Sequence, residues 1–156
     1  GEAGQQHKVG PCSLKELLES VVAFLKFDAD VKKVGVKLHV HEPVECNINA
    51  ERIKQVIINL IRNAAQAVTT PEGKIDVVLS RDGDDAMIRV VDNGCGIPED
   101  LLDSIWTPFF TTKEGTGMGL GLDISRMIIE QHSGRMECNS KVGKGTIMSI
   151  VLPAID

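Results

Sequence analysis

The chain has 156 residues, of which 42% are hydrophobic and 25% charged, and its formal net charge at pH 7 is −5. This length and apolar fraction fit one globular domain with a sizeable core and leave too little chain for two full domains. The negative charge argues against a basic surface spread over nucleic acid or anionic lipid, so any anionic ligand must be held locally.

The sequence also argues against a membrane span and a secretion signal. No apolar run approaches the roughly 20 residues of a spanning helix, and the N-terminal stretch GEAGQQHKVG lacks the apolar centre of a signal peptide. Four cysteines lie tens of residues apart, which favours free thiols in a reducing cytosol over a CxxC metal site or a disulfide scaffold. They are Cys12, Cys46, Cys95 and Cys138. We therefore expect a cytoplasmic domain that itself contacts no membrane, whatever anchor a full-length parent protein carries.

In chain order, the first predicted element is a helix over 14–33. Ser13 and Glu16 have the S-x-x-E spacing of a capping box, which is typical of a helix start. The next elements are, in order, a strand over 34–40, a turn at 42–43, a strand over 44–48 and a longer helix over 49–70.

The C-terminal half is predicted to consist mainly of strands. Asp82-Gly83 separates two apolar stretches and is typical of a hairpin turn, whose acids we interpret as solvated residues and not as calcium ligands. Gly143 and Gly145 mark the turn between the last two strands. The elements are, in order, strands over 76–80 and 86–92, a helix over 123–132, and strands over 135–140 and 146–153. Because strands and helices do not alternate strictly, the order favours an α+β fold with a largely antiparallel sheet.

One strand end carries an unexplained acid. In VVDNGCGIPED, residues 90–100, a β-branched run ends at Asp92 and is followed by Asn93-Gly94 and Gly96. A turn with positive φ angles accounts for the glycines. It does not account for the carboxylate, which indicates a binding role.

The longer helix has one apolar and one polar side. At 100° per residue, the apolar side gathers Ile53, Ile57, Leu60, Ile61, Ala64 and Val68, and the polar side gathers Arg52, Gln55, Asn59, Arg62, Asn63 and Gln66. Asn59 and Asn63 project amide oxygens from adjacent turns, a ligand type that suits a hard cation shared with phosphates. The alternative is a simply solvated face.

A glycine-rich stretch precedes the next helix. In FFTTKEGTGMGLGLDIS, residues 109–125, glycine recurs at every second position from 115 to 121. Alternating glycines expose consecutive backbone N–H groups, and a helix N-terminus adds partial positive charge, so together they favour a phosphate chain. A flexible linker is the alternative, but Met118, Leu120 and Leu122 are apolar. The stretch matches neither GxxxxGK[ST] nor GxGxxG, so another nucleotide-binding fold is needed.

Four separated blocks resemble, in order, the catalytic and ATP-binding domain of sensor histidine kinases. INLIRNAAQAV resembles the N box, VVDNGCGIP the G1 box, WTPFFTTK the F box and GTGMGLGL the G2 box, and GKGT at 143–146 is similar to the G3 element. The resemblance extends from about residue 13 to 153. It implies a Bergerat two-layer α/β sandwich, in which helices cover one face of a mixed, mostly antiparallel sheet and ATP lies between the long helix and a lid over 95–117.

The resemblance also implies domain limits and partners. A catalytic domain over 13–156 would follow a flexible tail or linker, residues 1–12, from a missing dimerisation domain. ATP-Mg would donate its γ-phosphoryl group to a histidine on that dimerisation domain, and a response regulator receiver domain would be the next partner. No nucleic acid is expected as a partner. NAAQAV together with PFFTTK is similar to the nitrogen-regulation and PAS-linked group.

Residue roles follow from the same resemblance. Asp92 would accept a hydrogen bond from the adenine amino group, Thr146 would complete the adenine side through water, and Gly94 and Gly96 would let the backbone approach the base. The implied catalytic residues are Asn59, Asn63 and Lys113, of which Asn63 binds Mg²⁺ with Asn59 as a helper and Lys113 reaches the phosphates. The implied ATP-binding residues are Asn63, Asp92, Gly94, Gly96, Ile97, Lys113, Gly115, Thr116, Gly117, Gly119, Leu120, Gly121 and Thr146. A solvated surface lysine is the alternative for Lys113.

The predicted lid contains three of the chain's five aromatic residues, Trp106, Phe109 and Phe110. Apolar side chains in a moving segment need a surface on which to dock, so lid closure or a partner domain is implied. The alternative is that these aromatics are core residues that anchor a long loop.

A GHKL-type ATPase, or a nucleotide-binding regulatory module without kinase activity, is the alternative function. The related clamps of the chaperone, gyrase and mismatch-repair type carry a glutamate four residues before the metal asparagine, where this chain has Asn59. An amide cannot act as a general base, so slow hydrolysis is expected. None of the four histidines has the helical setting of a phosphoacceptor, and at the end of a helix His132 would suit the dipole as a cation. The four are His7, His39, His41 and His132.

Overall fold

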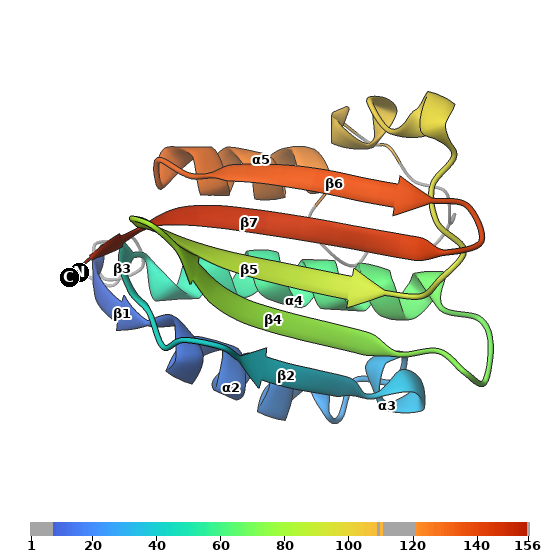
Figure 1. Cartoon of the computed structure of the whole chain (residues 1–156), viewed down its shortest axis with the longest axis horizontal. Coiled ribbons are helices and arrows are strands. Elements are labelled where there is room, and N and C mark those ends of the chain that lie inside the picture. The colour runs from blue at the N-terminus through green and yellow to red at the C-terminus, as the bar shows by residue number, and fades with distance from the viewer. Residues whose placement is uncertain (1–7, 109, 111–120, 156) are drawn as a thin grey trace.

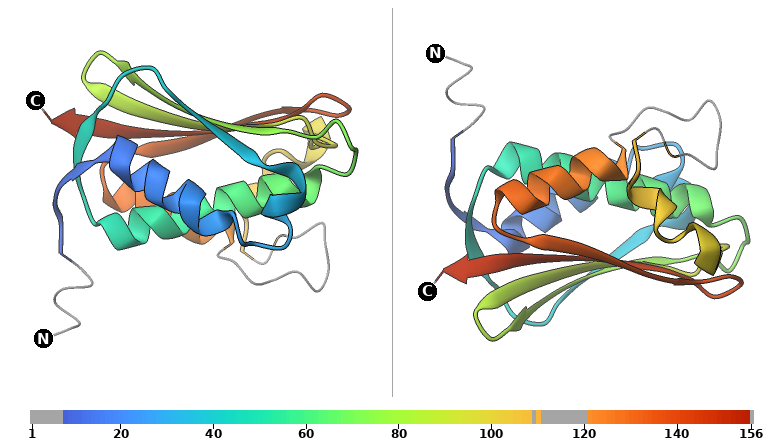
Figure 2. Two further views of the ribbon diagram at one scale, coloured as in Figure 1. Left: turned by 90° about the horizontal axis from the view of Figure 1, so that it is seen from below. Right: turned by 90° about the horizontal axis from the view of Figure 1, so that it is seen from above.

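The computed structural model describes residues 8–108, 110 and 121–155. Within these residues, seven strands form one sheet, and helices cover one of its faces (Figures 1 and 2). The strands are β1 (Gly10–Ser13), β2 (Val36–Val40), β3 (Glu45–Ile48), β4 (Ile75–Asp82), β5 (Asp85–Asp92), β6 (Arg135–Lys141) and β7 (Gly145–Ile155). Their order is β1-β3-β7-β5-β4-β2, with β6 also paired to β7. Only β2 and β4 run parallel among the described pairs, which confirms the predicted α+β sandwich with a mostly antiparallel sheet.

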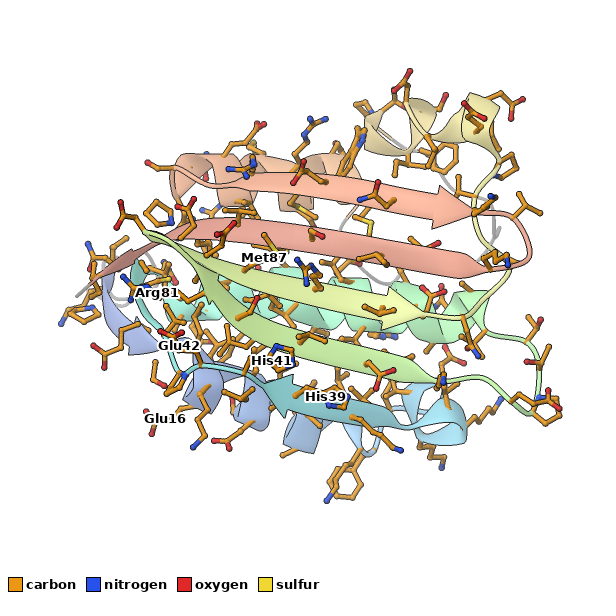
Figure 3. All side chains as sticks on the ribbon, viewed as in Figure 1. Glu16, His39, His41, Glu42, Arg81 and Met87 are labelled. Carbon is orange, nitrogen blue, oxygen red and sulfur yellow. The ribbon has the colours of Figure 1, made fainter. Side chains whose placement is uncertain are left out.

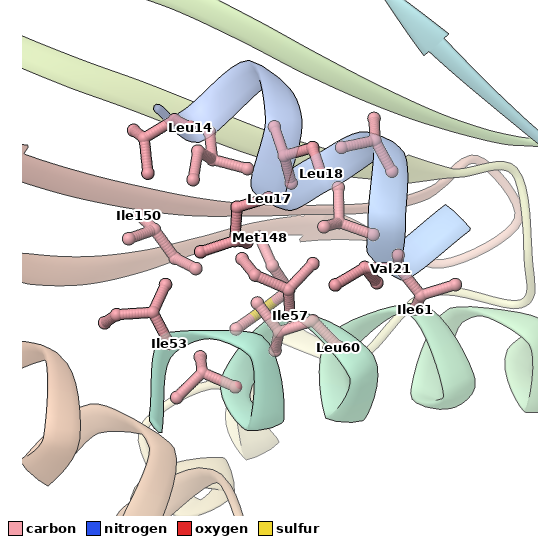
Figure 4. Packing of buried hydrophobic residues seen from close by; sticks show 14 of the residues in the cluster. Leu14, Leu17, Leu18, Val21, Ile53, Ile57, Leu60, Ile61, Met148 and Ile150 are labelled. Atoms are coloured by element: carbon pink, nitrogen blue, oxygen red, sulfur yellow. The ribbon is translucent and has the colours of Figure 1, made fainter. Parts of the chain in front are cut away.

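The helical layer packs its apolar sides onto the sheet. It contains α2 (Leu14–Leu25), α3 (Val31–Val34), α4 (Ala50–Ala67) and α5 (Leu122–Gln131), and two 3₁₀ turns, η1 (Glu99–Leu101) and η2 (Ser104–Trp106), follow β5. Leu17 of α2, Ile57 and Leu60 of α4, and Ile150 of β7 meet in the core (Figure 4). Each such buried side chain contributes about 1.5–3 kcal/mol to folding. This packing holds α4 along the sheet beside the end of β5.

The predicted helix over 14–33 is wrong in its second half. Its start is confirmed, because the Ser13 hydroxyl accepts the Glu16 N–H at 3.2 Å, but α2 ends at Leu25. Asp28 explains the break. One of its carboxylate oxygens accepts the N–H groups of Asp30 and Val31 at 3.0 and 3.1 Å, which caps the short α3. The other oxygen lies 3.1 Å from Arg62 Nε of α4, so side-chain bonds compete with a continuous helix.

The predicted tail, residues 1–12, is wrong for residues 10–12. They form β1, which pairs antiparallel with β3, so that Cys12 lies opposite Cys46. Pro11 has no N–H to donate, and such a residue fits an edge strand, which β1 is. The strand is four residues long and contains Gly10 and Pro11, so its sequence shows little β propensity. Only its pairing with β3 makes it a strand.

Both predicted hairpins are confirmed. Asp82 of β4 lies opposite Asp85 of β5, with Gly83 at φ 62° in the turn between them. The β6–β7 turn contains Gly143 at φ 79°. All four cysteines are free thiols. None of the described helices is long and apolar enough to cross a membrane.

Candidate functional site

Asp92 lies at the end of β5 on the helix-covered side of the sheet, and only 7% of it is exposed. Its Oδ1 accepts the Gly94 N–H at 2.8 Å. Burial raises the pKa of this carboxyl above its usual value, while the backbone N–H groups of Gly94 and Thr146 oppose that rise. The carboxylate is therefore held in one orientation, with little water around it, before any ligand arrives.

The glycines after Asp92 are required by close packing. A Cβ on Gly94 would overlap the carbonyl of Ala67 at the end of α4, and the neighbouring Cys95 N–H donates to that same carbonyl at 3.1 Å. Gly96 has a φ of +77°, and a Cβ there would overlap the Lys141 carbonyl of β6. The turn after β5 is thus clamped between the end of α4 and the β6–β7 turn. The expectation that Gly94 and Gly96 admit an adenine remains a prediction.

Thr146 is the second residue of β7 and lies directly opposite Asp92 of β5. It is 8% exposed, and its hydroxyl lies 2.7 Å from Ser140 Oγ of β6. Ser140 Oγ also accepts the N–H of Ile97 at 2.8 Å, which ties the segment after Gly96 to β6. Three predicted site residues, Asp92, Ile97 and Thr146, therefore converge at one end of the sheet.

The two asparagines of α4 differ in exposure. Asn63 is exposed, as expected for a ligand-facing residue. Asn59 is only 4% exposed, and its side-chain amide donates to Ser125 Oγ of α5 at 3.3 Å. Its expected place on an open polar face is therefore wrong, because α5 packs across that side of α4. A helical projection of α4 cannot show a second helix that arrives from later in the chain.

The start of α5 follows the glycine-rich stretch as predicted, with Gly121 at its N-cap. The N-cap residue Gly121 makes no side-chain capping hydrogen bond, and the first N–H groups of a helix suit an anion. Six predicted site residues lie outside the described residues and stay predictions: Lys113, Gly115, Thr116, Gly117, Gly119 and Leu120.

The first part of the predicted lid packs on α5. Ile105 is 2% exposed, and Trp106 packs against the core with the Arg126 guanidinium 4.5 Å above its ring. Such a cation–π contact contributes about 0.5–2 kcal/mol. Trp106 is thus a core anchor, as the alternative interpretation held, while Phe109 lies outside the described residues.

Three polar residues with structural roles at the site were not predicted from the sequence. Asn93 accepts the Lys74 N–H at 2.8 Å and donates to the Glu72 carbonyl at 3.0 Å, which fixes the loop before β4 to the turn after Asp92. Ser125 accepts the side-chain amide of Asn59, and the Ser140 hydroxyl contacts that of Thr146. A structural role for Asn93 could have been predicted, because asparagine is typical of turns. A serine inside a helix or strand gives no comparable indication in the sequence.

The three histidines that the structure describes lie away from Asp92, and His7 lies outside the described residues. His39 and His41 are on the open face of the sheet (Figure 3), and His39 Nε2 lies 2.8 Å from Asp76. His132 ends α5, where its Nε2 accepts the Asn49 N–H at 3.2 Å and its Nδ1 donates to the Ile128 carbonyl at 2.7 Å. Both ring nitrogens of His132 are thus used in hydrogen bonds within the domain.

Comparisons with known proteins agree with this geometry. The sequence profile of the histidine kinase-, DNA gyrase B- and HSP90-like ATPase family matches residues 48–156. Sporulation kinase C of Bacillus subtilis strain 168 is 34% identical over 142 residues, which cover 90% of this chain and 33% of that protein. Sensor histidine kinase ZraS of Escherichia coli K12 is 36% identical over 141 residues, which cover 90% of this chain and 30% of that protein. The chain thus spans about a third of the length of these curated relatives.

Solved structures show the same fold. The catalytic domain of histidine kinase ThkA superposes with a TM-score of 0.81 at 30% identity, covering 94% of this chain and 95% of that chain. ThkA in complex with the response regulator protein TrrA gives a TM-score of 0.79 at 29% identity, covering 94% of this chain and 42% of that chain. The chain therefore belongs to the histidine kinase-, DNA gyrase B- and HSP90-like ATPase family and corresponds to the catalytic domain of a sensor histidine kinase.

Proposed function

We propose that this domain binds ATP with Mg²⁺ and donates the γ-phosphoryl group to a histidine on a separate dimerisation domain of its parent protein. The observation that carries the proposal is Asp92, a buried carboxylate at a strand end, held by backbone N–H groups. Such a group is costly to bury, and a ligand that donates a hydrogen bond to it offsets that cost.

Asp92 supplies the base selectivity. The exocyclic amino group of adenine would donate to this carboxylate. Guanine has a carbonyl at the same position, so two acceptors would face each other, at a cost of about 1–3 kcal/mol for an unsatisfied buried polar group. Thr146, directly opposite Asp92, would complete the hydrogen bonds on the adenine side.

Asn63 and the start of α5 suit the phosphate end of the nucleotide. Asn63 is an exposed amide on α4, and a neutral oxygen is an acceptable ligand for Mg²⁺ that is also bound by phosphates. The N-terminus of α5 would attract the phosphate chain, and Lys113 would add a positive charge. Asn63 would hold Mg²⁺, which would supply positive charge beside the phosphate chain.

Asn59 favours the kinase over the hydrolytic ATPase. The side chain is a neutral amide, is buried, and is already bonded to Ser125. It offers no general base for water at the position where the clamp ATPases have a carboxylate. The γ-phosphoryl group therefore needs an acceptor from outside the domain. A response regulator would receive it next, as the complex of ThkA with TrrA suggests. ATP use and this partnership favour a cytoplasmic location for the domain.

Calorimetric titration with ADP and ATP, with and without Mg²⁺, tests the binding half of the proposal. We expect saturable binding of both nucleotides and tighter ATP binding with Mg²⁺. No binding of either nucleotide would overturn the proposed function.

For the transfer half, the domain is mixed with the dimerisation domain of its own parent protein and γ-labelled ATP. The expected product is an acid-labile phosphohistidine on that partner, and a domain that binds ATP but labels nothing would overturn the kinase assignment.

A further inference from the structure

Cys12 and Cys46 face each other at one edge of the sheet. Cys12 of β1 lies directly opposite Cys46 of β3. In the strand pairs that the structure describes, no other cysteine has a cysteine opposite it, and Cys138 of β6 lies opposite Met148. Side chains at opposite positions of two antiparallel strands project to the same face. Both thiols pack against the hydrophobic core, so they lie on the same side of β1 and β3.

The backbone spacing at this pair suits a disulfide. The Leu14 N–H donates to the Val44 carbonyl at 2.9 Å, and hydrogen-bonded pairs alternate along an antiparallel ladder, so Cys12 and Cys46 are a hydrogen-bonded pair. The Cα atoms of such a pair are about 5.5 Å apart, within the range of about 4.4–6.8 Å that is usual for disulfides. The Cys12 thiol donates to the Ile48 carbonyl at 3.8 Å. A thiol is a weak donor, so turning it toward Cys46 costs little.

We propose that Cys12 and Cys46 form a redox site, at which a peroxide joins the two thiols in a disulfide and small thiols reopen it. The site is separate from the proposed nucleotide site, because β1 and β3 lie at the opposite end of the sheet from the tip of β5, where Asp92 lies (Figure 1). Cys46 lies opposite Ala154 of β7. Thr146, opposite Asp92, precedes Ala154 by eight residues, which is about 26 Å of strand. The inference therefore does not depend on nucleotide binding.

The different exposure of the two thiols sets the order of the steps. Cys46 is fully buried, and burial raises the pKa of its thiol to about 11, whereas Cys12 is half-buried. The peroxide therefore reaches Cys12 first: the O–O bond breaks, the sulfur takes one oxygen as a sulfenic acid, and one water leaves. The Cys46 sulfur then attacks the Cys12 sulfur, the S–O bond breaks, and the oxygen leaves as a second water with the Cys46 proton. Two thiols thus lose two electrons and two protons to one peroxide.

The geometry makes this disulfide a reversible one. The Cβ atoms of opposite residues are about 4.5–5.5 Å apart, and a relaxed disulfide needs about 3.5–4.5 Å, so β1 must shift toward β3. A four-residue strand at the edge of the sheet can shift, since it has a neighbouring strand on one side only. Residual strain makes the bond easier to reduce, and two small thiols return it to the dithiol while they form their own disulfide. Oxidation would thus lock β1, and the loop that holds α2 and α3, onto the sheet until a thiol reduces the bond.

The test maps the thiols of the reduced domain after treatment with hydrogen peroxide. The remaining thiols are alkylated, the chain is digested without reductant, and joined peptides are identified by mass spectrometry. The expected product is the peptide of Cys12 joined to that of Cys46. The thermal unfolding midpoint is expected to rise on oxidation, because the closed loop restricts the unfolded chain, and to return to its first value after dithiothreitol.

Two variants make the result specific. Cys12→Ser is expected to lose both the joined peptides and the rise in the midpoint, and Cys12→Ala takes its place if that variant does not fold. Cys95→Ser is the matched control, because it removes an exposed thiol outside the strands, and it is expected to keep both effects. Joined peptides that contain Cys95 or Cys138 instead, or a Cys12 oxidised to the sulfinic acid beside an unchanged Cys46 thiol, would overturn the inference. A Cys12–Cys46 disulfide that leaves the midpoint unchanged would overturn the locking of β1.

Discussion

Asp92, the proposed adenine-binding residue, lowers the stability of the fold when it is charged. Burial raises the pKa of its carboxyl, which means that the folded domain disfavours the charged form. Above that pKa the charge therefore lowers the free energy of unfolding, and protonation relieves the effect as the pH falls through the raised value. The sign is opposite to that of a salt-bridged carboxylate. Ligand binding and stability thus place opposite demands on this residue.

Asp92→Asn should abolish adenine-nucleotide binding and raise the thermal unfolding midpoint of the free domain at pH 7. The amide oxygen can still accept the Gly94 N–H, but the buried charge is gone, and the amide NH₂ can face the adenine amino group as a donor. Calorimetric titration and thermal unfolding check the two effects, with Asp82→Asn in the exposed β4–β5 turn as the control. A variant that binds ATP as the parent does would contradict the assignment of Asp92.

The raised pKa of Asp92 also predicts the pH dependence of binding. Adenine-nucleotide affinity should fall on acidification at a higher pH than for an ordinary aspartate, whose pKa is near 3.8. In the same window the difference in unfolding free energy between the parent and Asp92→Asn should shrink, because the parent becomes neutral. Titrations and denaturant unfolding over a pH series measure both trends. A parent whose affinity holds down to the pH range of exposed carboxylates would argue against a buried Asp92.

Helix α4 carries both site asparagines, and its contacts with α5 separate their roles. Asn59 is locked to Ser125 between the two helices, and Asn63, one turn later, is exposed. The same amide side chain is thus structural at one position and available to a ligand at the next turn.

Asn59→Ala should lower the free energy of unfolding by about 1–3 kcal/mol, because it leaves the buried Ser125 hydroxyl without this partner. Denaturant unfolding measures the change, and Gln55→Ala on the exposed side of α4 is the control. Asn59→Glu should destabilise the fold as well, since a carboxylate would be buried between α4 and α5. Equal stability of Asn59→Ala and the control would show that the contact contributes nothing.

Asn63→Ala should leave the stability within about 0.5 kcal/mol of the parent, as is usual for an exposed position. It should lose most of the Mg²⁺-dependent gain in ATP affinity and keep the weaker binding without metal. Titrations with ATP, with and without Mg²⁺, separate the two contributions. An equal loss under both conditions would point to a role other than metal binding.

The domain is a two-layer sandwich, and the proposed function assigns the phosphoryl acceptor to another domain. The isolated domain should bind ATP but hydrolyse it slowly, since loss of a positioned general base typically reduces the rate by about 10²–10⁴-fold. Phosphate release by the domain alone, measured against a clamp ATPase under the same conditions, checks this expectation. Release at a comparable rate, unchanged by the acceptor domain, would favour the hydrolase.

The sequence by itself determined most of the local elements and the candidate site residues. Asp92 with its glycines, the amphipathic α4 and the glycine run before α5 are patterns of near neighbours, and local periodicity and turn chemistry make them readable. Contacts between distant segments were decided by the tertiary structure alone. β1 exists because it pairs with β3, and Asn59 is buried because α5 crosses α4. α2 ends early because Asp28 accepts local backbone N–H groups and forms an ion pair with Arg62. Ser140 bonds Thr146 only because β6 pairs with β7. Such contacts depend on packing between elements, and no spacing along one chain segment encodes them.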